Sequence, residues 1–249
     1  MGIKNILISQ PTPTNNAPYT ELTTKYGVNV EFMPFFKVEP LNVKEFRAQK
    51  INILDFTAVV FTARTTIDAF FKLCEELRII VPEDMKYFCV SEAIALYLQK
   101  HIVYRKRKIF FGDGTAASIP TVIGTKHKDE TFLIACTENQ KTDLHKLFVK
   151  TKYKFDSAAF VKTINSNLAE IDLHKYDIVV VYTPQDVKSM LENYPNFKQD
   201  NIKFAAFGQY SAKALKAAKL VPQILAPTPE APSVAKALDL YLSSGKNKI

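Results

Sequence analysis

Three segments of this chain recur in the same order about 120 residues further along. In each pair, a strand-like apolar run is followed by a short turn and the start of a helix-like segment. The pairs are AVVFTARTTIDAFF (58–71) with VVVYTPQDVKSML (179–191), KYFCVSEAIALYL (86–98) with KFAAFGQYSAKAL (203–215), and KIFFGDGTAASI (108–119) with PQILAPTPEAPSV (222–234). Three matches in order indicate a duplicated unit. The sequence therefore predicts two domains of similar fold.

Each copy alternates apolar runs of strand length with amphipathic helical periods. Ala58–Thr62 and Ile178–Thr183 have the length and composition of buried strands, and Thr66–Leu77 places its apolar side chains on one helical stripe. Strands that alternate with helices form parallel sheets covered by helices. The sequence therefore predicts an α/β protein with two flavodoxin-like or Rossmann-like lobes and parallel sheets.

The N-terminal segment contributes a strand over Lys4–Ser9, a helix, and one long strand over Val28–Val38 before the first copy begins. The second copy is one strand short of an independent sheet, so we expect Lys4–Ser9 to lie in one sheet with Ile178–Thr183. One lobe is then inserted into the other, and two strands form a hinge between them. The predicted parts are 1–38 plus 164–249 for the first lobe, 42–158 for the inserted lobe, and 35–41 with 159–163 for the hinge strands.

The composition is that of a globular protein. Of 249 residues, 47% are hydrophobic and 23% are charged. No apolar run approaches the ~20 residues that a membrane span needs, and the N-terminus does not have the pattern of a signal peptide. Cys74, Cys89 and Cys136 are too widely spaced for a disulfide framework or a zinc site. We therefore expect a cytoplasmic protein with reduced thiols and no membrane association.

The charge balance indicates an anionic partner. The net charge is +8 and the pI is about 9.2. The one dense basic cluster, Arg105–Lys108, has no aromatic ladder and no nucleic-acid-binding motif beside it. We therefore expect a small anionic ligand and no nucleic acid. RNA binding stays an alternative that rests on charge alone.

Polar residues follow the predicted strands at the points where parallel sheets bind ligands. Ligands lie beyond the carboxyl ends of such strands, and in a two-lobed protein we expect them in the cleft between the lobes. Hydroxyls and free amides at helix starts can receive carboxylates. The spacing of Thr65 and Asp68 predicts a capping box, and Pro184 suits a first helical turn. The candidate ligand-contact residues are Thr62, Ala63, Arg64, Thr65, Ser91, Thr183, Pro184, Gln185, Gly208, Gln209, Tyr210 and Ser211.

Familiar catalytic and cofactor motifs are absent from the sequence. Gly112-Asp113-Gly114 lacks the third glycine of a dinucleotide-binding loop, and no P-loop or nucleophilic-serine motif occurs. The four histidines are far apart along the chain. We therefore expect no cofactor and no metal, and an enzyme that works through binding geometry.

Four segments carry a resemblance to a known family. VVFTART (59–65), VVVYTPQ (179–185), KFAAFGQYSAKAL (203–215) and APTPEAPSVAKAL (226–238) resemble segments of uroporphyrinogen-III synthases in order and spacing. The resemblance covers essentially the whole chain, including the order of the inserted domain. It adds Thr228, in the Pro-Thr segment, to the candidate contacts.

This resemblance implies a defined reaction. Members of the family are two-lobed, cofactor-free lyases of tetrapyrrole (haem) biosynthesis that close hydroxymethylbilane, a linear tetrapyrrole rich in carboxylates, to uroporphyrinogen III. The terminal hydroxyl leaves, the substituted position of ring D is attacked to give a spiro intermediate, and ring D is inverted. So acidic a substrate accounts for the basic charge through steering and carboxylate pairing. We further expect a monomer in transient contact with the preceding pathway enzyme.

Several positions depart from the family pattern. Ala63 stands where serine is common, Ser91 and Asp186 stand where glycine is common, and Ile94 replaces a threonine. The tyrosine that the family carries on the returning hinge strand falls near Phe160–Val161, which cannot ionise. No catalytic residue is therefore assigned by the resemblance.

Two questions stay open at this point. Tyr182 and Tyr210 are local alternatives for a proton donor, although each also fits a core or rim position. A two-lobed protein that binds or senses a small anionic ligand without turnover is the alternative class of function. Because no titratable group is clustered at the strand ends, we expect catalysis by positioning rather than by a general acid.

Overall fold

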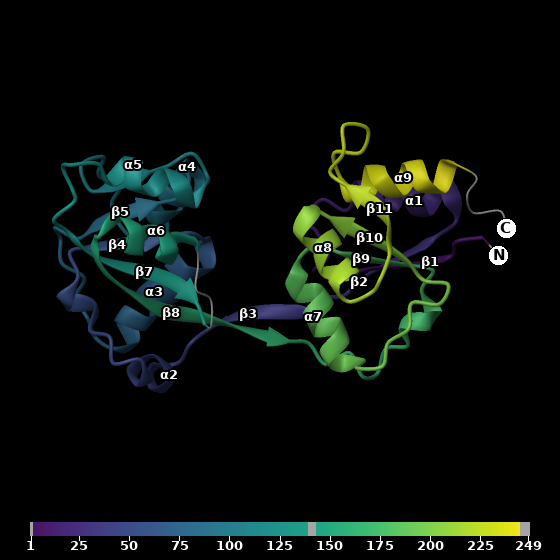
Figure 1. Cartoon of the computed structure of the whole chain (residues 1–249), viewed down its shortest axis with the longest axis horizontal. Coiled ribbons are helices and arrows are strands. Elements are labelled where there is room, and N and C mark those ends of the chain that lie inside the picture. Colours follow the sequence, from purple (N-terminus) through teal and green to yellow (C-terminus); the bar gives the residue numbers. More distant parts are fainter. Residues whose placement is uncertain (1, 139–142, 245–249) are drawn as a thin grey trace. The chain divides into compact units, whose positions relative to one another are not determined.

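The computed structural model describes residues 2–138 and 143–244 and divides the chain into two compact units (Figure 1). Unit 1 comprises Met1–Lys37 and Asn165–Ile249, and unit 2 comprises Val38–Ile164. The second unit is thus continuous in sequence, whereas the first is assembled from both ends of the chain. Each unit is built around its own sheet.

Unit 1 contains a parallel five-stranded sheet in the order β11-β10-β9-β1-β2. As predicted, the N-terminal strand pairs with the first strand of the second repeat, with Ile6 opposite Ile178. The central strands are buried on both faces, which explains their uninterrupted apolar sequences. The strands are β1 (Asn5–Ile8), β2 (Asn29–Phe32), β9 (Ile178–Val181), β10 (Lys203–Phe207) and β11 (Pro222–Ala226).

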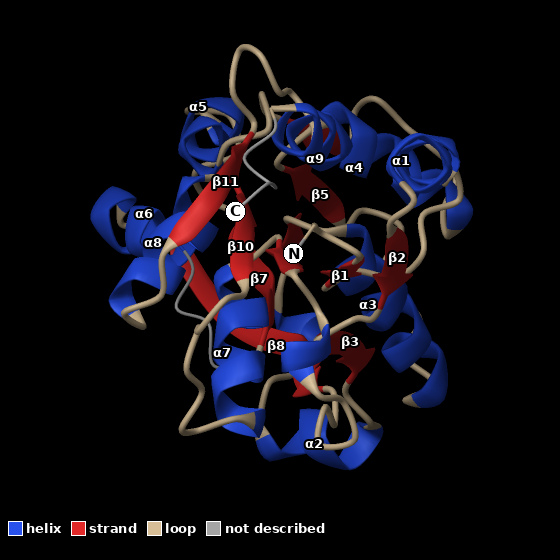
Figure 2. Cartoon of the chain, turned by 90° about the vertical axis from the view of Figure 1, so that its right-hand side faces the viewer, coloured by secondary structure: helices blue, strands red, loops and turns tan. Residues whose placement is uncertain are grey.

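Two pairs of helices cover the sheet of unit 1, one pair on each face (Figure 2). Helices α1 (Ala17–Tyr26) and α9 (Val234–Ser243) pack over Ile6 and Ile178. Helices α7 (Pro184–Asn193) and α8 (Gln209–Ala217) pack over Leu7, Val179 and their neighbours on the other face. Successive strand residues therefore serve opposite cores, as the pleat of a strand requires.

Unit 2 contains a six-stranded sheet in the order β3-β8-β7-β4-β5-β6. The strands from β8 to β6 are parallel. At the other edge, the Leu41 amide donates to the Phe160 carbonyl and the Ser166 amide donates to the Phe35 carbonyl, so β3 runs opposite to β8. The strands are β3 (Phe36–Pro40), β4 (Ala58–Phe61), β5 (Lys86–Cys89), β6 (Ile109–Phe111), β7 (Thr131–Thr137) and β8 (Lys154–Asn165).

Helices cover both faces of this second sheet as well. On one face, α2 (Val43–Ala48) and α3 (Arg64–Glu76) contribute Phe46, Phe70 and their neighbours to the core. On the other face, α5 (Ile119–Ile123) and α6 (Asp143–Thr151) pack over β4, β5 and β7. The remaining helical elements are α4 (Glu92–Tyr97) and the short 3₁₀ turns η1 (Ile53–Asp55), η2 (Leu98–Lys100), η3 (Ala116–Ser118) and η4 (Leu173–Lys175).

The single long strand predicted over Val28–Val38 is wrong. Two strands, β2 and β3, occupy this stretch and belong to different sheets. Pro34 between them has no N–H with which to continue a ladder. Phe35 is fully buried in the core beneath α7, where its carbonyl accepts a hydrogen bond from the Ser189 hydroxyl. The chain therefore turns at this point to fill the core of unit 1.

The three cysteines are buried, as their apolar sequence surroundings predict. Cys74, Cys89 and Cys136 are buried and free, and burial raises the pKa of both Cys74 and Cys89 to about 12. Their thiols are therefore uncharged packing groups. Among the described residues, no helix combines the length and apolar character that crossing a membrane requires.

Candidate functional site

The candidate contact residues gather at the carboxyl ends of the parallel strands, in one group on each unit. On unit 1, they follow the neighbouring strands β9, β10 and β11, and this group is called the unit-1 edge; its members are Thr183, Pro184, Gln185, Gly208, Gln209, Tyr210, Ser211 and Thr228. On unit 2, they follow the neighbouring strands β4 and β5, and this group is called the unit-2 edge; its members are Thr62, Ala63, Arg64, Thr65 and Ser91. Each sheet therefore assembles its own group.

The first turn of α7 is held by a complete capping box. The Thr183 hydroxyl accepts a hydrogen bond from the Asp186 amide at 3.3 Å. In return, the Asp186 carboxylate accepts hydrogen bonds from the amides of Thr183 at 2.7 Å and Tyr182 at 2.9 Å. Pro184 occupies the first helical turn, as predicted. The side chain of Thr183 is thus engaged by its own helix.

The carboxyl group of Asp186 is fully buried beneath this turn. Burial raises its pKa, and the amides of Thr183 and Tyr182 together with nearby hydroxyls oppose the rise. Oδ1 of Asp186 and the hydroxyl of Ser9, at the end of β1, are both buried without a well-aligned hydrogen bond. The unit-1 edge therefore contains a buried carboxyl group. From the sequence, Asp186 was recognised only as a departure from the glycine that is common in the family.

The start of α8 depends on Gly208 and Ser211. Gly208 has a φ of 81°, in the region that favours glycine, and lies directly before the helix. The Ser211 hydroxyl donates to the carbonyls of Tyr182 and Phe207, both at 2.7 Å, and the residue is 1% exposed. Ser211 therefore ties α8 to the ends of β9 and β10 and does not present its hydroxyl to solvent.

Two further candidates of the unit-1 edge also have internal partners. The Thr228 hydroxyl accepts a hydrogen bond from the Ala231 amide at 3.0 Å and closes the turn after β11. The Gln185 amide group donates to the Asn165 side chain at 2.8 Å. Pro184, Gln209 and Tyr210 are exposed, and Tyr210 is 78% exposed. Hydroxyl groups at this edge are therefore largely used within the protein.

A pair of tyrosines at the unit-1 edge was only partly anticipated. The hydroxyls of Tyr19 and Tyr182 lie 3.0 Å apart. Burial, followed by the bond to Tyr19, raises the pKa of Tyr182 well above its ordinary value. Tyr182 was considered from its place after β9, but Tyr19 lies on α1 and was missed. The position of α1 in the sequence could have indicated Tyr19, because this helix follows the carboxyl end of β1, where ligands bind in parallel sheets.

The unit-2 edge is built differently, and the capping box predicted for Thr65 and Asp68 is wrong. Helix α3 begins at Arg64, with Ala63 in the capping position and no side-chain cap. Thr65 therefore lies inside the first turn and is exposed. The Asp68 carboxylate instead accepts hydrogen bonds from Tyr97 at 2.7 Å, Lys100 at 2.9 Å and His101 at 2.8 Å.

These contacts hold Asp68 as a charged group. Burial would raise the pKa of Asp68, but the hydrogen bonds from Tyr97, Lys100 and His101 outweigh it and lower that pKa. The guanidinium of exposed Arg64 lies over the Tyr97 ring, 5.3 Å from its centroid. Among the described residues, Arg64 is thus a cation without an ion-pair partner at the start of α3, and an aromatic ring supports it on one face.

The remaining positions at the unit-2 edge have no titratable group. Ser91 precedes α4 without a side-chain cap and is half-buried, as are Thr62 and Ala63. On the returning strand β8, Phe160 and Val161 are each 1% exposed within the core of unit 2. Among the described residues, no group of three or more His, Cys, Asp or Glu side chains could hold a metal ion.

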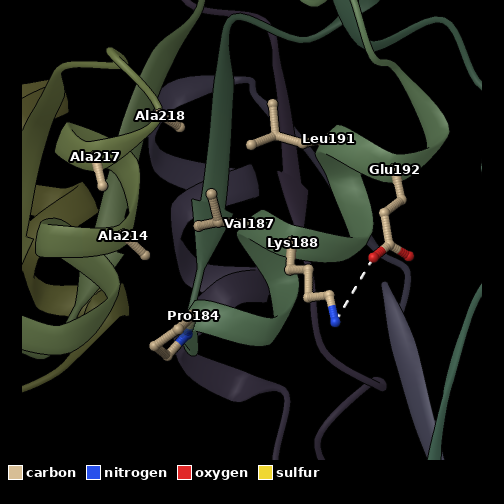
Figure 3. Close-up of a pocket in the computed structure, with 8 residues that line it drawn as sticks. All are labelled: Pro184, Val187, Lys188, Leu191, Glu192, Ala214, Ala217 and Ala218. Atoms are coloured by element: carbon tan, nitrogen blue, oxygen red, sulfur yellow. Dashed lines mark ion pairs between the residues drawn. The ribbon is translucent and has the colours of Figure 1, made fainter.

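A groove of about 480 Å³ lies between α7 and α8 (Figure 3). Its lining is mostly aliphatic, and Lys188 and Glu192 form an ion pair of 3.7 Å at its rim. The lining residues are Pro184, Val187, Lys188, Leu191, Glu192, Ala214, Ala217 and Ala218. Only Pro184 belongs to the candidate contact residues, so the groove is separate from most of the unit-1 edge.

Comparisons with known proteins agree on one family. The family model described as uroporphyrinogen-III synthase HemD matches residues 17–236. A uroporphyrinogen III synthase from Thermus thermophilus has a TM-score of 0.61 at 14% identity, covering 96% of this chain and 97% of that one. Uroporphyrinogen-III synthetase from Helicobacter pylori has a TM-score of 0.61 at 15% identity, covering 97% of this chain and 99% of that one. Among curated proteins, none matches the chain in sequence. These structural likenesses show a shared fold, and the family match across most of the chain shows that it belongs to the uroporphyrinogen-III synthase family.

Proposed function

We propose that this chain closes hydroxymethylbilane to uroporphyrinogen III with inversion of ring D, as a cyclising lyase of tetrapyrrole biosynthesis. The match of the family model across residues 17–236 carries this proposal. The net charge of +8 supports it, because a basic protein attracts a substrate rich in carboxylates. The unit-2 edge supports it further with Arg64, an exposed cation at a strand–helix turn.

We propose that the unit-1 edge and the unit-2 edge each bind carboxylates of the substrate. The unit-2 edge binds carboxylates through Arg64, Thr65 and their neighbours, and the unit-1 edge binds them through peptide N–H groups in the first turn of α8, which has no side-chain cap. In this proposal, the lobes are 1–38 plus 164–249 and 42–158, and the hinge strands are 35–41 and 159–163. Ser211 supports the site from within, since both of its hydrogen bonds go to backbone carbonyls.

The proposed catalysis relies on positioning. The pyrrole nitrogen can expel the terminal hydroxyl, and the protein then holds the chain so that the substituted carbon of ring D is attacked. Hydroxyl oxygens and peptide carbonyl dipoles at the strand ends stabilise the cationic intermediates. Because this scheme assigns no general acid, isomer III should survive any single substitution of Thr62, Thr183, Tyr182, Tyr210 or Ser211. Each should cost less than the 10²–10⁴-fold that removal of a general acid costs.

The test is the isomer that forms when the purified chain is added to freshly generated hydroxymethylbilane. Closure without an enzyme gives isomer I, so the expected result is a shift to isomer III, with a heat-unfolded sample as the control. Binding of the substrate with no change of isomer would instead favour the alternative of a two-lobed protein that binds or senses an anionic ligand.

The same proposal covers the setting of the reaction. We infer a monomer that works in the cytoplasm, which fits three free and buried cysteines. We also infer transient contact with the enzyme that supplies hydroxymethylbilane, because the open-chain substrate closes by itself when released. Sedimentation of the chain alone and with that enzyme tests both statements. A stable dimer of this chain would contradict the first.

A further inference from the structure

Four aromatic side chains form a continuous row at the unit-1 edge, and this row is called the aromatic row. Phe32 ends β2 and packs edge-on against Tyr19 of α1, with ring centroids 5.1 Å apart. The Tyr19 hydroxyl meets the Tyr182 hydroxyl directly after β9. Tyr182 packs against Phe207 at the end of β10, with centroids 5.3 Å apart. The row thus joins the carboxyl ends of β2, β9 and β10.

All four members of the aromatic row are partly exposed. They lie at the margin of the core formed by β1, β9, α1 and α9, and Val181 and Ala206, which precede Tyr182 and Phe207, are buried. Tyr182 directly precedes Thr183, the capping residue of α7. The row therefore shares the strand ends where the candidate contact residues gather.

One of the two phenolic O–H groups of the tyrosine pair has no acceptor within the described structure. Each phenol has one O–H and can also accept a hydrogen bond. The bond between Tyr19 and Tyr182 uses one of the two O–H groups, and within the described structure neither hydroxyl has another protein partner. Whichever tyrosine donates to the other, the second O–H is left without a protein acceptor.

We propose that the Tyr19–Tyr182 pair donates this remaining O–H to a carboxylate of the substrate, while the rest of the aromatic row packs against the pyrrole ring that carries it. This inference rests on the proposed function. A carboxylate is suited to the place because it only accepts hydrogen bonds, and the pair offers a single donor. A pyrrole ring is flat and apolar, so the neighbouring aromatic rings can pack against it.

The raised pKa of Tyr182 agrees with a neutral donor rather than a proton-transfer group. A phenol that stays protonated keeps its O–H at every pH at which the enzyme works. The pair therefore binds and orients the substrate, and neither phenol loses its proton in the reaction.

The test compares Tyr19→Phe, Tyr182→Phe and the double variant, because phenylalanine keeps the ring and removes only the hydroxyl. Each single variant leaves one unpaired hydroxyl that can still donate, so its KM should rise less than about 1.5-fold. The double variant has no donor, so its KM should rise roughly ten-fold with little change in kcat. This excess over the product of the single effects is the expected signature of a shared donor.

Tyr26→Phe is the matched control. Tyr26 lies on the same helix, and its hydroxyl donates to Asp239 at 2.7 Å, away from the aromatic row. Its KM should stay at the parent value, and thermal unfolding of all variants checks that they fold. Tyr19→Leu, which also removes a ring from the row, should raise KM even if the double variant folds poorly.

Two outcomes would overturn the inference. One is a folded double variant whose KM equals that of the parent. The other is a double effect equal to the product of the single effects, since two independent contacts would multiply. A parent chain that forms no isomer III would refute the proposed function instead, so the two failures can be told apart.

Discussion

The turns from β9 to α7 and from β4 to α3 occupy matching places in the two predicted repeats, yet they are stabilised in different ways. In the alignment of the repeats, Thr62 corresponds to Thr183 and Thr65 corresponds to Asp186. Thr183 and Asp186 form the capping box of α7, whereas α3 has no side-chain cap and begins after Ala63. In this alignment, the capping position of α3 thus falls one residue later than that of α7, on Ala63, which has no hydroxyl with which to cap the helix.

This difference shows that turns at matching places in the two units can serve different purposes, stability in unit 1 and ligand binding in unit 2. At the unit-1 edge, the polar side chains hold the turns together, and the peptide N–H groups in the first turn of α8 and the aromatic row remain for a ligand. At the unit-2 edge, the turn is left uncapped, and Arg64 and Thr65 remain exposed. We therefore expect side chains to matter more for binding on unit 2 and more for stability on unit 1.

The largest expected effect is that of Asp186→Ala on stability. The substitution leaves the partly buried amides of Tyr182 and Thr183 without an acceptor and removes the capping box, so the free energy of unfolding should fall by about 2 kcal/mol. Asp68→Ala on α3 is the matched control and should cost less than about 1 kcal/mol, because Asp68 is partly exposed. Urea unfolding of both variants measures the difference. Equal losses would break the comparison.

The next effect concerns binding at the unit-2 edge. Arg64→Ala should raise KM about five-fold and change kcat by less than two-fold, because a charge-assisted contact is lost at a partly solvated position. Lys72→Ala is the control on the same helix, since Lys72 is exposed and pairs only weakly with Glu76. Steady-state kinetics with hydroxymethylbilane measure both. An unchanged KM would remove Arg64 from the proposed site.

The buried carboxyl group on unit 1 should also make stability depend on pH. Because the pKa of Asp186 is raised in the folded state, its contribution to stability is present at low pH and is lost as the pH rises through that pKa. Relative to Asp186→Asn, which cannot ionise, the parent should therefore gain stability between pH 7 and pH 4. Urea unfolding at the two pH values measures this. A constant difference would show that Asp186 ionises equally in both states.

The smallest expected effect is a gain. Ala63→Ser gives α3 a hydroxyl at its capping position, where the backbone already has the extended conformation of a cap, with φ −147° and ψ 153°. The free energy of unfolding should rise by about 0.5 kcal/mol or slightly more. Thermal or urea unfolding against the parent measures it. A loss of stability would mean that the uncapped turn is held in another way, and the comparison of the two turns would need revision.

The sequence predicted the repeats and the sheet partner of the first strand, because buried parallel strands have long apolar runs and fixed spacing. It was wrong where a single residue changed the path of the chain. Pro34 divided one predicted strand into β2 and β3. The capping pattern of Thr65 and Asp68 was also misread, because the helix begins at Arg64 and Asp68 finds partners on α4 and in the turn that follows it.

The candidate site was predictable only in part. Strand ends could be located along the chain, so the candidate residues fall at the two edges. Whether a hydroxyl is free or already bonded could not be predicted, as Ser211 illustrates, because its acceptors lie on two other segments. Tyr19 was missed for the same reason, since its partner is 163 residues away.

The discontinuity of unit 1 has a consequence for synthesis of the chain on the ribosome. Strand β1 emerges first, but its partner β9 is made only after the whole of unit 2. Unit 2 can fold as soon as it is complete, whereas Ile6, Leu7 and Ile8, fully buried in the finished protein, lack one of their neighbouring strands until then. We therefore expect the apolar strand β1 of the nascent chain to remain incompletely covered until β9 has been synthesised. The nascent chain should be most prone to aggregation while unit 2 is being translated, and slow translation would lengthen this period.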